Sequence, residues 1–330
     1  MRIVAKAPVR TADIGGWTDT WFASAGSVCS VAIEPGITVT VDAQPGKPDA
    51  VALTIGGESR RLADDPLIEA AIRHVPIACA LKVQIDSGVP VGSGLGTSAS
   101  VTVALLAALD ALRSSLEPET GLARTPADLA CDAHRVETSL GWQSGVQDQL
   151  AAAHGGVHQF EVRYPYGGSA DRLDGPELRR LLDDRLLTVY LGRPHSSSVV
   201  HESVIAALEG LDNGPLLAPL RRAAVDAANA LRASDLRAYG QAMTDAHEGT
   251  RSLHGDLVCA EAEGVAAIAQ HFGAAGWKVN GAGGNGGSIA VLGPSDPQRM
   301  AALVRALDAE PGVELLRTRV AAQGVTVRRG

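Results

Sequence analysis

The sequence predicts an α+β fold divided into two domains, residues 1–170 and 171–330. A chain of 330 residues exceeds what one compact core usually needs, and this favours two domains. The composition turns to Gly, Ser and Asp between Gly167 and Pro176, which marks the boundary. Beyond it, strand and helix patterns alternate, and the chain ends with a strand, a helix and a strand. That order is typical of an α+β domain with helices on one face of its sheet.

The composition excludes several classes of protein. It is globular, with 45% hydrophobic and 20% charged residues, and a net charge of −8 gives no basic surface for nucleic acid or an anionic membrane. The N-terminal residues contain no apolar leader, and no stretch reaches the length of a transmembrane helix. We therefore expect a soluble, cytoplasmic protein. No CxxC pair is present, so neither a zinc site nor a disulfide framework is indicated by the four cysteines Cys29, Cys79, Cys131 and Cys259.

The first ninety residues are predicted to be mostly strands. Strand patterns cover 1–10 and 27–43, and we expect a turn at Glu34-Pro35-Gly36 to divide the second of them. Another strand and turn at 51–62, a short helix at 65–75 and a strand at 77–90 follow.

The loop between the first two strands is unusual for a connector. Adjacent glycines, Gly15 and Gly16, precede Trp17, and Asp19 stands between two threonines. Only 3% of the chain is aromatic, yet Trp21 and Phe22 also lie here. An aromatic face beside a carboxylate can hold a sugar, since the ring covers apolar C–H groups and the acid accepts hydroxyl hydrogen bonds. Aromatic side chains that plug a hydrophobic edge explain the loop equally well.

Residues 90–112 combine a glycine-rich loop with an apolar helix pattern. Free N–H groups at a helix N-terminus attract anions, and glycines let the backbone approach a phosphate. A P-loop requires a Lys before the Ser/Thr, but Gly96 precedes Thr97 and the segment contains no Lys. The spacing to Asp110 also fits a dinucleotide fingerprint poorly. We predict a phosphate-binding loop made of Pro90, Gly92, Ser93, Gly94, Leu95, Gly96, Thr97 and Ser98.

Two helices are expected after this loop, and a second glycine cluster follows much later. Thr125 is suited to cap a helix with Pro126 at its first position, and Glu137 lies beside the apolar stripe of that helix. A short helix is expected around Asp148. Without further information, Glu137 would be interpreted as an exposed acid on a helix and Asp148 as a helix N-cap.

A second glycine cluster lies near the end of the chain. Five glycines between Gly281 and Gly287 exceed what a turn requires and indicate a close backbone approach.

Three segments together resemble the GHMP kinase superfamily. Residues 90–99, PVGSGLGTSA, are similar to its motif Pro-x-x-x-Gly-Leu-Gly-Ser-Ser-Ala, with Thr97 in place of the first Ser. Residues 281–284 resemble its glycine-rich third motif, which Asn285 interrupts here, and residues 7–10 followed by 15–19 resemble its first motif. The resemblance implies an N-terminal domain like domain 2 of ribosomal protein S5 and a ferredoxin-like C-terminal domain, with ATP and substrate between them.

Two segments narrow the resemblance within the superfamily. GGWTDT at 15–20 and QDQLAAAHGG at 147–156 are similar to the fucokinases and the D-glycero-D-manno-heptose 7-phosphate kinases. Both groups phosphorylate the anomeric hydroxyl of a sugar. The resemblance therefore implies an ATP-dependent sugar 1-kinase for a heptose 7-phosphate or a fucose-like sugar, working as a monomer or homodimer. The alternatives are another GHMP kinase, similar to galactokinase or mevalonate kinase, and a non-catalytic sensor of sugar and ATP.

The same resemblance implies the role of each site residue. Ser98 and Glu137 match the ligands of Mg²⁺, Asp148 matches the general base, and Arg10 matches the basic residue beside it. A second phosphate site at His195 and the serines 196–198 is also expected, at a helix N-terminus. The residues expected to bind the substrate are Gly15, Gly16, Trp17, Thr18, Asp19, Gly283 and Gly284.

Overall fold

The computed structural model describes residues 1–48, 50–117, 124–194, 198–209 and 213–330. The first part of the chain forms β1 (Arg2–Ile14), β2 (Ala25–Gln44), β3 (Val51–Ile55), β4 (Glu58–Arg60), η1 (Leu62–Asp64), α1 (Pro66–His74), β5 (Ala80–Ser87), α2 (Thr97–Leu116), α3 (Pro126–Ser139), α4 (Gln147–His154), β6 (Val157–Arg163) and β7 (Gly167–Arg172). The remainder forms α5 (Pro176–Arg185), β8 (Leu186–Tyr190), α6 (Ser198–Leu208), α7 (Gly214–Arg232), α8 (Leu236–Leu253), η3 (Gly255–Leu257), α9 (Ala260–His271), β9 (Gly276–Val279), β10 (Ser288–Leu292), α10 (Pro297–Ala309), β11 (Glu314–Leu316), β12 (Arg319–Val320) and β13 (Thr326–Arg329).

Two sheets organise these elements, which confirms the α+β fold. The first is built on the long antiparallel pair β1 and β2 and has the order β13-β1-β2-β5-β3-β4, with β6 and β12 also on β2 and β7 on β6. The second is antiparallel, with the order β11-β8-β10-β9. Strand β1 also contacts β9 and β10, so it joins the two sheets.

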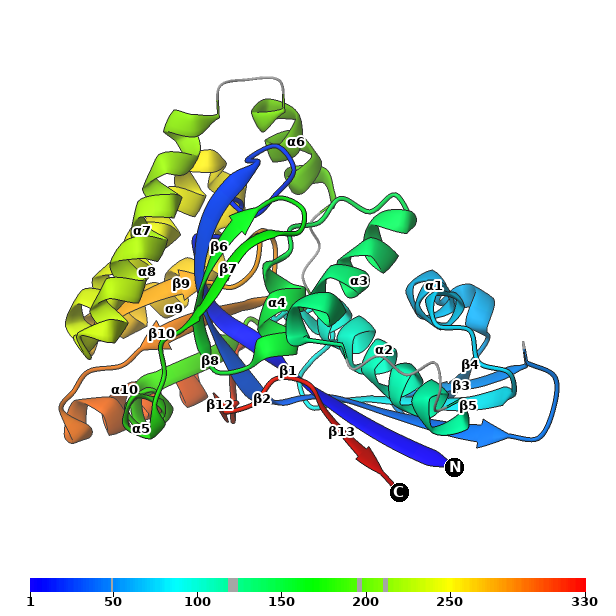
Figure 1. The fold of residues 1–330 in the computed structure, drawn as a ribbon. Helices are drawn as coiled ribbons and strands as arrows, with labels where there is room; N and C mark the ends of the chain where they lie inside the picture. Colours follow the sequence, from blue (N-terminus) through cyan, green and yellow to red (C-terminus); the bar gives the residue numbers. More distant parts are fainter. Residues whose placement is uncertain (49, 118–123, 195–197, 210–212) are drawn as a thin grey trace.

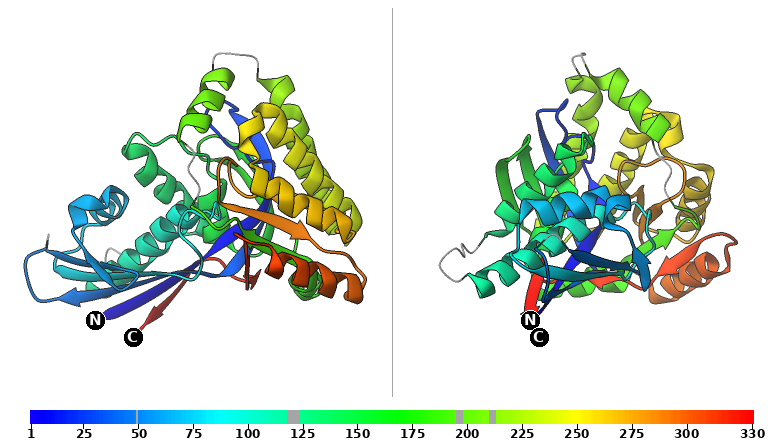
Figure 2. Two further views of the ribbon diagram at one scale, coloured as in Figure 1. Left: turned by 180° about the vertical axis from the view of Figure 1, so that it is seen from behind. Right: turned by 90° about the vertical axis from the view of Figure 1, so that its right-hand side faces the viewer.

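Helices cover both sheets. Figure 1 shows α2, α3 and α4 on one side of the long β1–β2 pair, and α7, α8 and the second sheet on the other. The α7–α8 pair packs on β2 and β9, while α9 and α10 pack with the second sheet. The two termini lie side by side (Figure 2) because β13 pairs with β1.

Helix α2 is the central helix of the first part of the chain. The expectation that no stretch reaches the length of a transmembrane helix is wrong for α2, which is long and apolar enough to cross a membrane and is alone in this among the described helices. Leu105, Leu106 and Leu109 are nevertheless fully buried in the core, where α2 packs on β1 and β2. Burial of this surface against two strands explains the composition of α2 as that of a core helix.

Two local predictions about the fold can be assessed directly. The capped helix is confirmed: Thr125 Oγ1 accepts the N–H of Asp128 in a capping box before α3. The turn at Glu34-Pro35-Gly36 is wrong, because β2 continues through these residues. The register with β1 shifts here instead, between Ala7 and Val9, and this irregularity accommodates the proline.

Candidate active site

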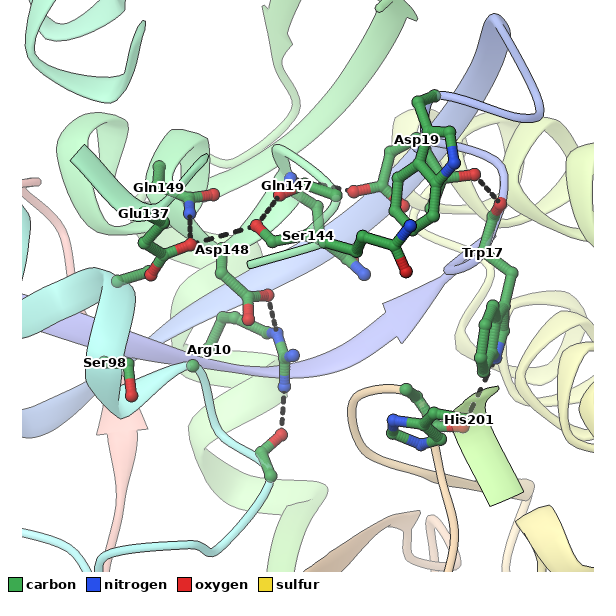
Figure 3. Close-up of a pocket in the computed structure, with 18 of the residues that line it drawn as sticks. Arg10, Trp17, Asp19, Ser98, Glu137, Ser144, Gln147, Asp148, Gln149 and His201 are labelled. Carbon is green, nitrogen blue, oxygen red and sulfur yellow. Dashed lines mark hydrogen bonds and ion pairs between the residues drawn. The ribbon is translucent and has the colours of Figure 1, made fainter. Parts of the chain in front are cut away.

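A cavity of about 340 Å³ gathers most of the predicted site residues. Its walls come from β1, the loop after β1, the loop before α2, α3, the start of α4, α6 and the loop before β10, as Figure 3 shows in part. Ten residues predicted from the sequence line it: Arg10, Trp17, Asp19, Gly92, Gly94, Gly96, Thr97, Ser98, Glu137 and Asp148.

Arg10 and Asp148 form an ion pair at the centre of this cavity. Arg10 is 3% exposed, and its Nε donates to Asp148 Oδ1 over 2.8 Å. Its Nη1 donates to the carbonyl of Gly94 in the glycine loop (Figure 3). Burial by itself lowers the pKa of the guanidinium, but the charges of Asp13 and Asp148 outweigh this and raise it. Arg10 is therefore a fixed cation beside a partly exposed carboxylate.

The loop before α2 turns through three glycines in the left-handed region. The φ angles of Gly92, Gly94 and Gly96 are 73°, 71° and 75°, which side chains rarely allow. Gly96 is the N-cap of α2 and supplies no side-chain cap, so the first N–H groups of the helix are left for an anion. Thr97 and Ser98 present their side chains to the cavity at this end.

Three of the residues predicted for this loop do not line the cavity. Leu95 and Ser93 are fully buried, and Ser93 accepts a hydrogen bond from Ser288 of β10 through its carbonyl. Pro90 is half-buried and accepts the N–H of Ser93. These three residues support the loop from behind.

Glu137 lies on α3 and is 6% exposed. Its Oε2 accepts hydrogen bonds from Ser144 Oγ (2.9 Å) and Gln149 Nε2 (2.6 Å), as Figure 3 shows. Burial, together with the nearby charge of Asp148, raises the pKa of Glu137 to about 7 despite these hydrogen bonds. A cation at this place would favour the charged carboxylate.

The oxygen donors of Ser98 and Glu137 fit a magnesium ion. Mg²⁺ prefers hard oxygen ligands and is commonly held by one or two protein groups together with phosphate oxygens and water. Glu137 Oε1 has no hydrogen-bond partner within the described residues, while Oε2 is held in place by two. The described part of the chain contains no group of three His, Cys, Asp or Glu that could enclose a metal by itself. A site with only these two protein ligands suits an ion whose other ligands are phosphate oxygens and water.

Asp19 and Trp17 line another wall of the cavity. Asp19 is 1% exposed and accepts the backbone N–H of Gln147 over 2.9 Å, and burial raises its pKa to about 6. The indole of Trp17 donates to the carbonyl of Ala282 and meets the His201 ring edge-on at 5.4 Å. Trp21, Phe22 and Ile205 extend this apolar surface. A carboxylate therefore stands beside an aromatic wall.

The other predicted substrate residues lie behind these walls. Thr18 is fully buried, and its hydroxyl donates to the carbonyl of Gly15. A Cβ at Gly15 would come within 2.1 Å of the Ser27 carbonyl oxygen, so the turn requires glycine there. Gly283 receives a hydrogen bond from His201, and Gly284 donates to the carbonyl of Leu257. These backbone contacts leave Ala282 as the residue of the second glycine cluster that lines the cavity.

The remaining predicted site residues are Gly16 and those of the segment that begins at His195. Gly16 packs beside Gln147 and Asp13 and does not line the cavity. His195 and the serines at 196 and 197 lie outside the described residues.

Several residues of the site were missed by sequence reasoning. Ser144 and Gln149 hold Glu137, and His201 packs on Trp17. Asp13 lies beside Arg10, and Lys278 lies beside Asp13; both are fully buried. Asp13 lies beyond the strand predicted at 1–10, and no local pattern in the sequence singles out Asp13 or Lys278 as buried.

Comparisons with known proteins agree with this geometry. Residues 66–156 match the family described as GHMP kinases N terminal domain. The chain is 26% identical over 327 residues to a bifunctional fucokinase/GDP-fucose pyrophosphorylase of Arabidopsis thaliana, a match of 87% of this chain and 30% of that protein. It is 28% identical over 231 residues to a mevalonate kinase of Methanothermobacter thermautotrophicus, a match of 64% of this chain and 65% of that protein. The chain thus spans less than a third of the plant protein and about two thirds of the archaeal one.

Solved structures share the fold over the whole chain. A D-glycero-D-manno-heptose 1-phosphate kinase from Bacteroides thetaiotaomicron superimposes with a TM-score of 0.73 at 20% identity, covering 99% of each chain. A galactokinase of Lactococcus lactis complexed with galactose gives the same TM-score at 17% identity, covering 98% of this chain and 95% of that one. At these identities the similarity concerns the fold.

Proposed function

We propose that this chain is a small-molecule kinase of the GHMP type that phosphorylates the anomeric (C1) hydroxyl of a sugar, with ATP as donor. The acceptors proposed are a heptose 7-phosphate or a fucose-like sugar. The observation that carries the proposal is the Arg10–Asp148 pair, which lies in one cavity with the N-terminus of α2 and with Asp19 and Trp17. Similarity to the fucokinase and the heptose kinase adds support.

Each group has a task in phosphoryl transfer, which depends on positioning and charge stabilisation. The glycine loop and the first turn of α2 hold the phosphates of ATP. Ser98 and Glu137 would hold Mg²⁺, which would supply charge neutralisation when bound. Asp148 takes the proton of the sugar hydroxyl as it attacks. Arg10 orients Asp148 and stabilises charge on the transferring group. Asp19 accepts sugar hydroxyl groups, and Trp17 covers the apolar face of the ring.

The charges of the cavity favour an uncharged acceptor of the fucose type. Within the described part of the chain, the lining contains Arg10 as its one Arg or Lys, and Arg10 is already paired with Asp148. Asp19 and Glu137 add negative charge. Burial lowers the pKa of His201, so this side chain offers little positive charge at neutral pH. The phosphate of a sugar phosphate or the carboxylate of mevalonate would lack a free cation here.

The proposal is tested by acceptor-dependent ADP release. The purified chain with ATP and Mg²⁺ is assayed with L-fucose, D-galactose, D-glycero-D-manno-heptose 7-phosphate and mevalonate, and loss of the reducing end is followed in parallel. We expect ADP release with a sugar, a product blocked at C1, and the highest kcat/KM with fucose. Release with mevalonate alone would identify the other branch of the family. No release with any acceptor, despite ATP binding, would favour a sensor.

Replacing Asp148, the proposed base, tests its role directly. In Asp148→Asn the amide keeps the size of the side chain but cannot accept the proton, so turnover should fall about 100-fold or more. ATP affinity should remain, because the phosphate-binding groups are untouched. Unchanged turnover would remove Asp148 from this role.

A further inference from the structure

Four charged side chains, three of them buried, form a row that crosses from the second sheet to the centre of the cavity. Lys278 of β9 lies 3.4 Å from Asp13 Oδ1, measured from Nζ. The same Oδ1 lies 3.8 Å from Arg10 Nη1, and Arg10 Nε lies 2.8 Å from Asp148. The side chains of Lys278, Asp13 and Arg10 are 1%, 0% and 4% exposed. Positive and negative charges therefore alternate along the row, and solvent screens the first three weakly.

Arg10 stands between two carboxylates that compete for it. Asp148, which is 29% exposed, holds it at hydrogen-bond distance, while the fully buried Asp13 lies an ångström farther away. A buried, unneutralised Asp13 would attract Arg10 more strongly than the partly exposed Asp148, because water weakens the interaction of Arg10 with Asp148. Lys278 supplies the charge that offsets this attraction.

Asp13 also fixes the loop that carries one wall of the cavity. Both of its carboxylate oxygens accept the backbone N–H of Gly281, each over 3.1 Å. The next residue, Ala282, lines the cavity and accepts the indole N–H of Trp17. Lys278 stands three positions before this loop and is anchored by the carbonyl of Val279 over 2.6 Å. One carboxylate thus connects Arg10, the glycine cluster and the aromatic wall.

We propose that Lys278 and Asp13 are positioning residues, and that Lys278 neutralises Asp13 so that Arg10 remains directed at Asp148. The inference rests on the proposed function, in which Arg10 and Asp148 act on the sugar hydroxyl. In this proposal a residue of β9, a strand of the second sheet, controls how Arg10 aligns Asp148. Both residues act through Arg10 and contact no reacting group themselves.

Removal of the Lys278 charge tests the role. In Lys278→Met the guanidinium should turn toward Asp13, and kcat should fall between about 10- and 100-fold while KM for ATP and sugar changes little. Lys278→Arg keeps the cation and should recover much of the lost kcat. A crystal structure of Lys278→Met should show a longer distance between Arg10 Nε and Asp148. Lys82→Met, at an exposed lysine of β5, serves as the control and should match the wild type.

The double variant Asp13→Asn/Lys278→Met separates this role from simple support of the fold. It removes both charges, and Asn still offers an oxygen to the Gly281 N–H. Because a neutral amide at position 13 no longer competes for Arg10, the guanidinium should return to Asp148. The kcat and the thermal stability of the double variant should therefore both exceed those of Lys278→Met. A double variant as slow as the single one, or a Lys278→Met enzyme with wild-type kcat, would overturn the inference. If the wild type has no kinase activity, the proposed function fails, and the position of Arg10 in the crystal structures still decides the inference.

Discussion

At the scale of single residues, burial sets the acidity of two carboxyl groups that line the cavity with Asp148. Asp19 and Glu137 are 1% and 6% exposed, and burial raises their pKa values to about 6 and about 7. Loss of hydration disfavours a carboxylate, and the buried position holds it near the point where it gains or loses its proton. If these acids bind a hydroxyl group and a cation as proposed, we expect the binding to depend on pH close to neutrality.

Sugar affinity should follow the charge of Asp19. The carboxylate is the form that accepts hydroxyl hydrogen bonds, and its raised pKa of about 6 means that it is charged above pH 6 and protonated below. Sugar Kd, measured without nucleotide by titration calorimetry, should therefore rise as the pH falls from 7.5 to 5. Asp19→Asn should bind more weakly at pH 7.5, by about 1.5–3 kcal/mol, and with little pH dependence. An equally steep profile in this variant would assign the titration to another group.

At the scale of elements, the start of α2 depends on glycine at position 96. Its φ of 75° is strained for other residues, and an added Cβ would lie 3.1 Å from Asp148 Cγ. Gly141, just after α3, has the same φ of 75° and no atom within 4 Å of an added Cβ. The two glycines share a backbone requirement and differ in their surroundings.

Alanine substitutions at Gly96 and Gly141 should separate the effect of backbone strain on stability from the effect of an added methyl group on turnover. Both Gly96→Ala and Gly141→Ala should lose about 1 kcal/mol of stability, since each places a Cβ in the left-handed region. Only Gly96→Ala should also lose turnover, because the new methyl group pushes on Asp148. Thermal melts and kcat of the two variants check this, and equal kcat values would contradict it.

At the scale of the whole molecule, the last part of the chain completes the first sheet. Strand β13 pairs with β1, β12 pairs with β2, and α7 packs on β2. The domain division at residue 170 remains a proposal, and this position falls within β7. In place of the single final strand expected from the sequence, the chain ends in three strands, of which β11 belongs to the second sheet and β12 and β13 to the first.

A fragment ending at residue 170 should therefore not fold stably by itself. It lacks the strands that pair with β1 and β2, and it exposes the surface of β2 that α7 covers in the full chain. Circular dichroism and thermal unfolding of residues 1–170, compared with the full chain, test this. A cooperative transition with native near-ultraviolet signal would show instead that the first part of the chain is self-sufficient.

The sequence by itself determined several helices, among them α2 and α3, as well as the glycine loop and most of the polar residues that line the cavity. Capping residues, apolar periodicity and glycine spacing act over a few positions, so α2, α3 and the loop at 90–98 could be predicted locally. Motifs in the sequence pointed to Arg10, Ser98, Glu137 and Asp148, and all four line one cavity.

The tertiary structure decided the features that depend on residues distant in the sequence. The unbroken β2, the burial that shifts Asp19 and Glu137, and the contact of Lys278 with Asp13 across 265 positions of sequence arise only when both sheets meet at β1. Electrostatic and burial energies depend on separation in space, which a linear pattern does not record.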